Sequence, residues 1–194
     1  MITILLDSSN TSLTVGLAKD DVLLESISYE AWQAQSEHMI PELDKLLDKY
    51  QVSRKDIKEV VVAVSPGSYT GVRIAITIAK TIATVLDAKL YEISSLRCRK
   101  DRKNPSICVI NARSGRSYFG VYEDKKVIVS DCILTNEKVL EFIKEHPDFV
   151  LCGNTSYLGI EGKKPDIARE LLELKKIKEP SINPLAVKPI YIKD

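Results

Sequence analysis

The sequence predicts an α/β protein built from two units, each with three strands followed by a helix and a further strand. Three observations lead to this fold class. Both halves of the chain contain segments in that order, a basic run separates the halves, and 44% of the residues are hydrophobic, enough for a sizeable core. We therefore expect an N-terminal domain over residues 1–96, a basic linker over 97–105, and a smaller, trimmed C-terminal domain with an extended tail over 106–194.

The first unit opens with three strand-like segments. Residues 2–6 are a continuous apolar run, and Asp7-Ser8-Ser9-Asn10 has the composition of a turn. Residues 11–18 and 22–29 follow on short turns, which predicts an antiparallel meander. A helix is expected over 37–50, because apolar side chains recur there at steps of three and four residues. Those side chains are Met39, Ile40, Leu43, Leu46, Leu47 and Tyr50.

The centre of the first unit is a strand, a tight turn and a second helix. Residues 61–64 form a short apolar run typical of a strand covered on both faces, and Pro66-Gly67 ends it. Ser68 or Thr70 can cap a helix that continues to about residue 86, and residues 89–93 form another strand. The polar side chains of this helix fall on one narrow stripe, so we expect the first helix or a partner protein to cover much of the rest.

The second unit repeats this order of elements with fewer residues. Strands are expected over 106–111, 118–123 and 125–134, a helix capped by Asn136 through residue 145, and a buried strand over 149–152. The last forty residues contain one predicted helix, over 167–174, and an extended tail. Two such units side by side resemble the actin/hexokinase-like (ribonuclease H-like) architecture.

Five basic residues occupy seven positions between the two units. One interpretation is a small phosphate-contacting patch for tRNA, and the other is a solvated linker. The residues are Arg97, Arg99, Lys100, Arg102 and Lys103.

Charge and composition narrow the classes of function. The formal net charge is +1, so binding to nucleic acid or membrane would require a local patch. The four cysteines contain no C-x-x-C pair, which disfavours a zinc knuckle or a redox dithiol. We find neither a signal peptide nor an apolar run approaching a membrane span, and we expect a cytoplasmic protein without membrane contact.

The residues that could contact an anion or nucleotide lie in the first hairpin and the Pro-Gly turn. The turn lacks the lysine of a Walker A loop, and Ser8-Ser9-Asn10 stands where an actin/hexokinase-like nucleotide site would use glycine. We predict no catalytic residue, no metal site and no tightly bound cofactor. Six residues are candidate contacts for an anion or nucleotide: Asp7, Ser8, Gly67, Ser68, Thr70 and Gly71.

Several motifs resemble the TsaB (YeaZ) family of tRNA threonylcarbamoyladenosine (t6A) biosynthesis subunits. Ser65-Pro66-Gly67-Ser68-Tyr69-Thr70-Gly71-Val72-Arg73-Ile74 resembles the family signature G-P-G-S-F-T-G-L-R-I. Supporting matches are Ile4 to Ser9 with I-L-x-I-D-T-S, Gln35 to Pro41 with H-S-E-x-L-L-P, Ser94-Ser95-Leu96 with S-S-L, and Asn111-Ala112-Arg113 with D-A-R. Gln35 and Asn111 depart from the family residues, and the second half is shorter than is typical.

The resemblance implies a non-catalytic scaffold or activator. It would pair with the transferase subunit TsaD, be joined by the ATPase TsaE, and form a homodimer when alone. The complex would bring it to tRNA, and ATP or ADP could lie at the partner interface. The alternative is a stand-alone actin/hexokinase-like phosphotransferase that uses ATP. The interface is expected to form from the two helices of the first half. Its predicted residues are Met39, Leu43, Leu46, Tyr69, Val72, Arg73, Ile76, Ala79, Lys80 and Ala83.

Overall fold

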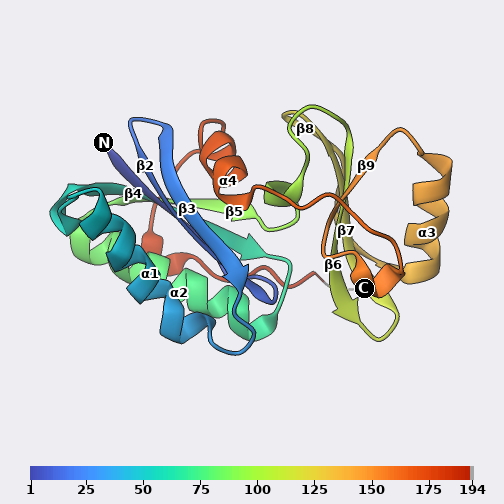
Figure 1. The fold of residues 1–194 in the computed structure, drawn as a ribbon, viewed down its shortest axis with the longest axis horizontal. Helices are drawn as coiled ribbons and strands as arrows, with labels where there is room; N and C mark the ends of the chain where they lie inside the picture. The colour runs from blue at the N-terminus through green and yellow to red at the C-terminus, as the bar shows by residue number, and fades with distance from the viewer. Residues whose placement is uncertain (193–194) are drawn as a thin grey trace.

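The computed structural model describes residues 1–192 and contains two mixed sheets with helices packed around them (Figure 1). The first sheet has five strands in the order β3-β2-β1-β4-β5, in which β1 pairs antiparallel with β2 and parallel with β4. Its strands are β1 (Ile2–Asp7), β2 (Ser12–Lys19), β3 (Val22–Glu30), β4 (Ile57–Ser65) and β5 (Lys89–Ser94). The predicted antiparallel meander and the predicted strand covered on both faces are both confirmed.

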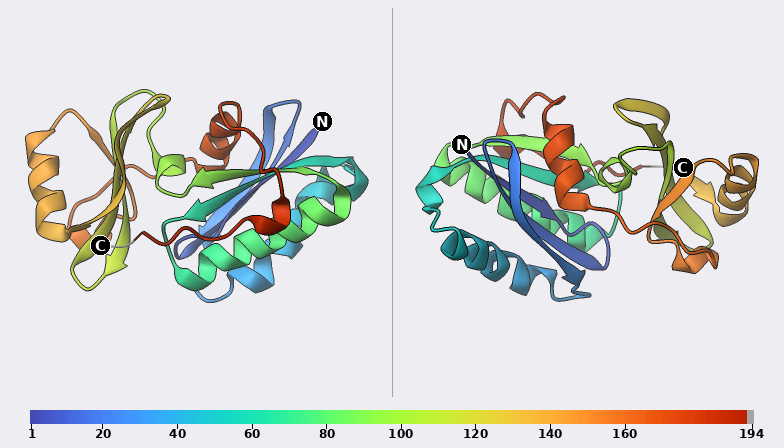
Figure 2. Two further views of the ribbon diagram at one scale, coloured as in Figure 1. Left: turned by 180° about the vertical axis from the view of Figure 1, so that it is seen from behind. Right: turned by 45° about the horizontal axis from the view of Figure 1, so that its top comes forward.

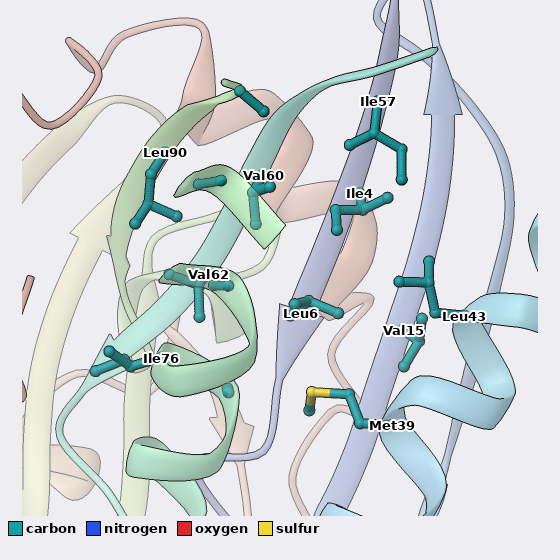
Figure 3. Close-up of a cluster of buried hydrophobic side chains, with 14 of the residues drawn as sticks. Ile4, Leu6, Val15, Met39, Leu43, Ile57, Val60, Val62, Ile76 and Leu90 are labelled. Carbon is teal, nitrogen blue, oxygen red and sulfur yellow. The ribbon is translucent and has the colours of Figure 1, made fainter. Parts of the chain in front are cut away.

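Helices cover both faces of the first sheet. On one face, α1 (Gln35–Lys49) and α2 (Tyr69–Leu86) lie side by side and form the largest hydrophobic cluster with the strands. Figure 3 shows Met39 and Leu43 of α1 and Ile76 of α2 directed at side chains of the sheet. On the other face, α4 (Ile167–Lys175) packs on a second cluster. The burial of the central strands on both faces explains their continuous apolar sequence.

The second sheet has four strands in the order β8-β7-β6-β9. Its elements are β6 (Ser106–Arg113), β7 (Arg116–Glu123), β8 (Lys126–Thr135), α3 (Asn136–Glu145) and β9 (Val150–Gly153). The parallel pairing of β6 with β9 corresponds to that of β1 with β4, and α3 covers one face, as α1 does in the first unit. The duplicated strand-strand-strand-helix-strand order of an actin/hexokinase-like fold is therefore confirmed, with a smaller second unit.

After residue 166 the chain returns to the first sheet. Helix α4 packs there, and the tail then runs along α2, as the red segment in Figure 2 shows. Val187 is buried in the α1–α2 cluster, and Lys80 donates a hydrogen bond of 3.0 Å to its carbonyl oxygen. The sequence-based division placed these residues in the C-terminal unit, whereas their packing is with the N-terminal one.

Helix ends differ from the predictions by a few residues. Helix α1 begins at Gln35, after Ala34, with no side-chain cap. Helix α2 begins at Tyr69, and the Ser68 hydroxyl accepts a hydrogen bond of 3.3 Å from the Gly71 amide, so Ser68 rather than Thr70 is the cap. Thr135, not Asn136, caps α3.

Helix α2 meets the length and hydropathy criterion of a membrane span, which the sequence reading had not found. One such helix is weak support for a span, because the core helices of globular proteins meet the same criterion. In this structure α2 packs on the first sheet through buried residues that include Val72, Ala75, Ile76 and Ala79.

Candidate functional site

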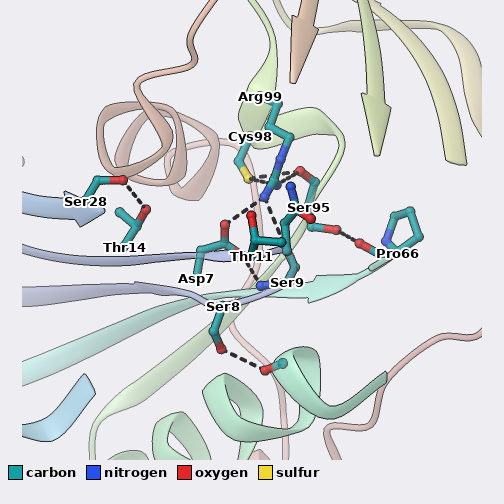
Figure 4. Close-up of polar contacts among 12 residues, drawn as sticks. Asp7, Ser8, Ser9, Thr11, Thr14, Ser28, Pro66, Ser95, Cys98 and Arg99 are labelled. Carbon is teal, nitrogen blue, oxygen red and sulfur yellow. Dashed lines mark hydrogen bonds and ion pairs between the residues drawn. The ribbon is translucent and has the colours of Figure 1, made fainter. Parts of the chain in front are cut away.

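The candidate site is the corner where the β1–β2 turn meets the start of α2 (Figure 4). The Ser8 hydroxyl donates to the Gly71 carbonyl oxygen at 2.7 Å, and the Ser68 amide donates to the Ser9 carbonyl oxygen at 2.7 Å. A Cβ atom added to Gly67 would collide with the Ser9 carbonyl oxygen, and one added to Gly71 with that of Ser8. The signature glycines therefore let two pieces of backbone pack directly together.

Asp7 lies buried at this corner and is fully partnered. One carboxylate oxygen accepts a hydrogen bond of 2.9 Å from the Ser9 amide. The other lies 3.0 Å from the Arg99 guanidinium, which also donates to the Ser9 hydroxyl at 3.1 Å and to the Ser95 carbonyl oxygen. Burial of Arg99 disfavours its charged form, but the Asp7 carboxylate outweighs this effect and raises the pKa of Arg99. The pair is an ion pair shut away from solvent.

This geometry corrects part of the predicted anion site. An actin/hexokinase-like site would direct Asp7 at a metal–phosphate, but here the Arg99 guanidinium lies against the carboxylate, and both side chains are buried. Ser8 and Gly71 are buried against each other. Gly67, Ser68 and Thr70 remain accessible and line a cleft. Within residues 1–192, no group of three or more His, Cys, Asp or Glu side chains is placed to hold a metal ion.

That cleft, which we call the aromatic cleft, has a volume of about 490 Å³. It is bordered by the β1–β2 turn, the start of α2, the β6–β7 hairpin and the tail. Tyr191 of the tail stacks on Tyr69 at 5.5 Å between ring centroids and accepts a hydrogen bond of 2.9 Å from Arg73. The guanidinium carbon of Arg73 lies 4.0 Å from the centroid of the Tyr69 ring. The tail thus adds a second aromatic ring to this side of the cleft.

The predicted partner interface is largely wrong at the level of residues. Its aliphatic members lie in this chain's own core, because the apolar faces of α1 and α2 turn toward the sheet. A pattern of apolar residues at helical spacing cannot distinguish a core face from a partner face. Tyr69 and Arg73 are exposed and Lys80 is half-buried. The buried members are Met39, Leu43, Leu46, Val72, Ile76, Ala79 and Ala83.

The basic run is likewise not an open patch. Arg99 pairs with Asp7, and the Lys100 ammonium lies 2.8 Å from the carboxylate of Glu170 on α4, with both side chains buried. Arg102 contacts the same carboxylate at 3.3 Å, and Arg97 donates to the Lys125 carbonyl oxygen at 2.5 Å. Lys103 is exposed. Because Arg99 and Lys100 are buried in ion pairs, they form neither a solvated linker nor a tRNA-contacting patch.

Sequence reasoning missed Trp32, Tyr191, Asn10 and Asn154, which also line the aromatic cleft. The turn that contains Asn111 and Arg113 can be read from the sequence either as a solvated hairpin or as a contact for an anion or a partner carboxylate, and the structure places both residues in the cleft. The residues that line the cleft come from segments far apart in the chain. The available signal was that Trp32, the one tryptophan, stands in a polar connection where no core position is expected.

Comparison with known proteins decides the family. The sequence model of the TsaD family, described as tRNA N6-adenosine threonylcarbamoyltransferase, matches residues 29–171. The chain is 33% identical over 149 residues to the tRNA threonylcarbamoyladenosine biosynthesis protein TsaB of Bacillus subtilis, a region that covers 72% of this chain. The chain belongs to the TsaB (YeaZ) family. The matched region spans 65% of the B. subtilis TsaB, just under two thirds of its length.

A second TsaB relative agrees with this assignment. The TsaB protein of Buchnera aphidicola subsp. Schizaphis graminum is 28% identical over 145 residues, covering 72% of this chain and 67% of the relative. The structure of YeaZ from Pseudomonas aeruginosa superposes with a TM-score of 0.83 at 22% identity, covering 98% of this chain and 99% of that one. This structural likeness establishes the fold across nearly the whole chain.

Proposed function

We propose that the chain is a non-catalytic accessory subunit in the synthesis of N6-threonylcarbamoyladenosine in tRNA. The observation that carries this proposal is the 33% identity to a TsaB protein named for that pathway. In this proposal the chain pairs with a TsaD-like transferase subunit in the cytoplasm, a TsaE-like ATPase joins the pair, and the complex brings the chain to tRNA. Alone, the chain forms a homodimer through the same surface.

The Asp7–Arg99 pair supports the non-catalytic part of the proposal. A stand-alone phosphotransferase of this fold would need the Asp7 carboxylate free to bind a metal–phosphate, and here Arg99 neutralises it inside the protein. Calorimetric titration of the isolated protein with ATP and Mg²⁺ tests the point. We expect no heat of metal-dependent binding, and tight ATP–Mg²⁺ binding that is lost in Asp7→Asn would establish the phosphotransferase alternative instead.

The outer faces of α1 and α2 are the proposed pairing surface. With Ile76 and Ala79 in the core, the exposed stripe of α2 contains Arg73, Thr77, Thr84 and Val85, and Val85 has an exposed fraction of 74%. Ile40 of the neighbouring α1 is 41% exposed. The exposed aliphatic side chains of Val85 and Ile40 supply apolar surface that a partner can bury.

Co-purification with the TsaD-like subunit tests this surface. Thr77→Arg places a long charged side chain on the exposed stripe without entering the core, so we expect a folded protein that pairs at least about tenfold more weakly, a loss of about 1.4 kcal/mol. Glu141→Arg on the exposed side of α3 is the matched control and should pair normally. Normal pairing of a folded Thr77→Arg protein would show that the surface lies elsewhere. Arginine at position 76 or 79 would test folding instead, because both side chains are buried.

A further inference from the structure

The exposed aromatic side chains of this protein are gathered in one place. Among residues 1–192, three aromatic side chains are exposed: Trp32 at 49%, Tyr69 at 58% and Tyr191 at 50%. All three line the aromatic cleft, although they come from the β3–α1 connection, the start of α2 and the tail. Exposed aromatic rings gathered in one cleft are typical of an interaction surface, and their faces can stack on a flat ligand.

The rest of the lining is polar and carries a positive charge. Asn10 and Asn111 supply amide groups that both donate and accept hydrogen bonds, and Arg113 is the cationic side chain of the cleft. No carboxylate lines the cleft within the part of the chain that the structure describes. A purely aliphatic partner surface would not match such a lining, whereas a nucleobase has stacking faces, hydrogen-bonding edges and an attached phosphate.

We propose that the aromatic cleft binds an unpaired nucleobase together with its adjoining phosphate, without a metal ion. The base stacks on the exposed rings, the asparagine amides contact its edge, and Arg113 contacts the phosphate. The volume of about 490 Å³ lies within the range of roughly 300–1,000 Å³ typical of small-ligand sites. The nearby Asp7 is closed by Arg99, so the site has no carboxylate free to anchor a metal–triphosphate. A single-stranded RNA and a free nucleotide can both supply this chemistry.

Trp32 provides the measurement, because it is the only tryptophan in the chain and lies in the cleft. The isolated protein is titrated in EDTA with adenosine monophosphate and, separately, with a short single-stranded RNA of mixed sequence, while tryptophan fluorescence is recorded. We expect saturable quenching. Quenching by the RNA alone identifies a strand as the source, quenching by the mononucleotide alone identifies a free nucleotide, and mutual competition identifies both.

Three variants locate the binding. Tyr69→Leu and Tyr191→Leu should weaken binding about tenfold, the loss expected for one stacked base. With one phosphate contact, raising salt from about 50 to 200 mM should weaken RNA binding about threefold, and Arg113→Gln should remove most of this dependence. Arg54→Gln, an exposed arginine paired with Asp44 on the surface, is the matched control. Circular dichroism and thermal midpoints establish that each variant is folded.

Two results would overturn the proposal. One is unchanged tryptophan emission with both probes together with no retention of labelled RNA at low salt, which would leave the cleft as a protein-docking surface. The other is binding that Tyr69→Leu, Tyr191→Leu and Arg113→Gln all leave unaltered in folded proteins.

Discussion

The two β-hairpins that open the two units of this protein end in very different turns. The β1–β2 turn is closed: Asp7, Ser8 and Ser9 are buried, and the start of α2 packs on their backbone. The β6–β7 turn is open: Arg113 and Ser114 are exposed, and a Cβ added to Gly115 would meet no atom within 4 Å. Both turns follow a strand at the same place in the duplicated fold.

This contrast shows that turns at corresponding places in a duplicated fold can differ completely in burial. The closing group of the first turn, Arg99, comes from the segment between the two units. Because that guanidinium lies against Asp7, the carboxylate of the first turn is not free to face a metal–phosphate. The second turn has no such cover, so its side chains border the aromatic cleft.

The largest expected effect is from removing the closing arginine. Arg99→Leu leaves the Asp7 carboxylate buried without its partner, which should lower the free energy of unfolding by about 3–5 kcal/mol in urea denaturation. Arg113→Leu in the open turn should change it by less than about 0.5 kcal/mol. Adding Asp7→Asn to Arg99→Leu should restore part of the loss. If both arginine substitutions changed the free energy of unfolding by the same small amount, the two turns would not differ in the way we describe.

A pair of glycine substitutions tests the same contrast through packing. Gly71→Ala should destabilise by about 2 kcal/mol, because the new methyl group collides with the Ser8 backbone. Without that collision, alanine would stabilise the helix by about 1 kcal/mol relative to glycine. The sign of the change in stability therefore shows whether the collision occurs. Gly115→Ala meets no neighbour and costs only about 1 kcal/mol, because its φ of 70° disfavours a side chain. Thermal and urea unfolding of both variants provide the comparison.

Asp101, in the segment that supplies Arg99, gives a pH-dependent test. Burial opposes its ionisation, but hydrogen bonds from Lys163, from the amides of Lys103 and Asn104, and from the Asn104 side chain lower its pKa to about 2. Since the folded pKa is below the unfolded value of about 3.9, the charged group stabilises the fold above about pH 4, and this stabilisation is lost as the pH falls through 2. Asp101→Asn should therefore cost about 2 kcal/mol at pH 7 and almost nothing near pH 2. A cost that did not change with pH would show that the carboxylate charge is not what stabilises this segment.

The smallest expected effect on stability is at Tyr191, in the aromatic cleft that the open turn borders. Tyr191→Leu removes a stacked ring that is half exposed, so we expect a loss of about 0.5–1 kcal/mol, read from the thermal midpoint. A larger loss would mean that the tail holds α2 in place. The stacked pair of Tyr69 and Tyr191 would then be part of the structural core of the first unit and not an open surface.

Much of the fold could be predicted from hydrophobic periodicity. The succession of strands and helices along each unit, the buried β4 and the two helices of the first unit all follow from local patterns, which report burial reliably. The predicted interface failed because Met39 and Ile76 have the same spacing whether they face a sheet or a partner.

The chemistry of the corner could not be predicted in the same way. Asp7 and Arg99 are 92 residues apart, and nothing in either segment indicates that they meet. A run of cations looks solvated in a sequence, because the buried carboxylates that pair with it, such as Glu170, lie in other elements. The aromatic cleft is assembled from six separate segments, so its members looked unrelated.

The central claim is that this chain supports t6A synthesis without performing the transfer itself. The most direct measurement is a threonylcarbamoylation assay on tRNA with a TsaD-like subunit, a TsaE-like ATPase and a supply of the activated threonylcarbamoyl donor, with and without this chain. We expect little modification by the partners alone, strong stimulation on adding the chain, and none from the chain without the transferase subunit. Full modification in its absence, or modification by the chain alone, would contradict the account.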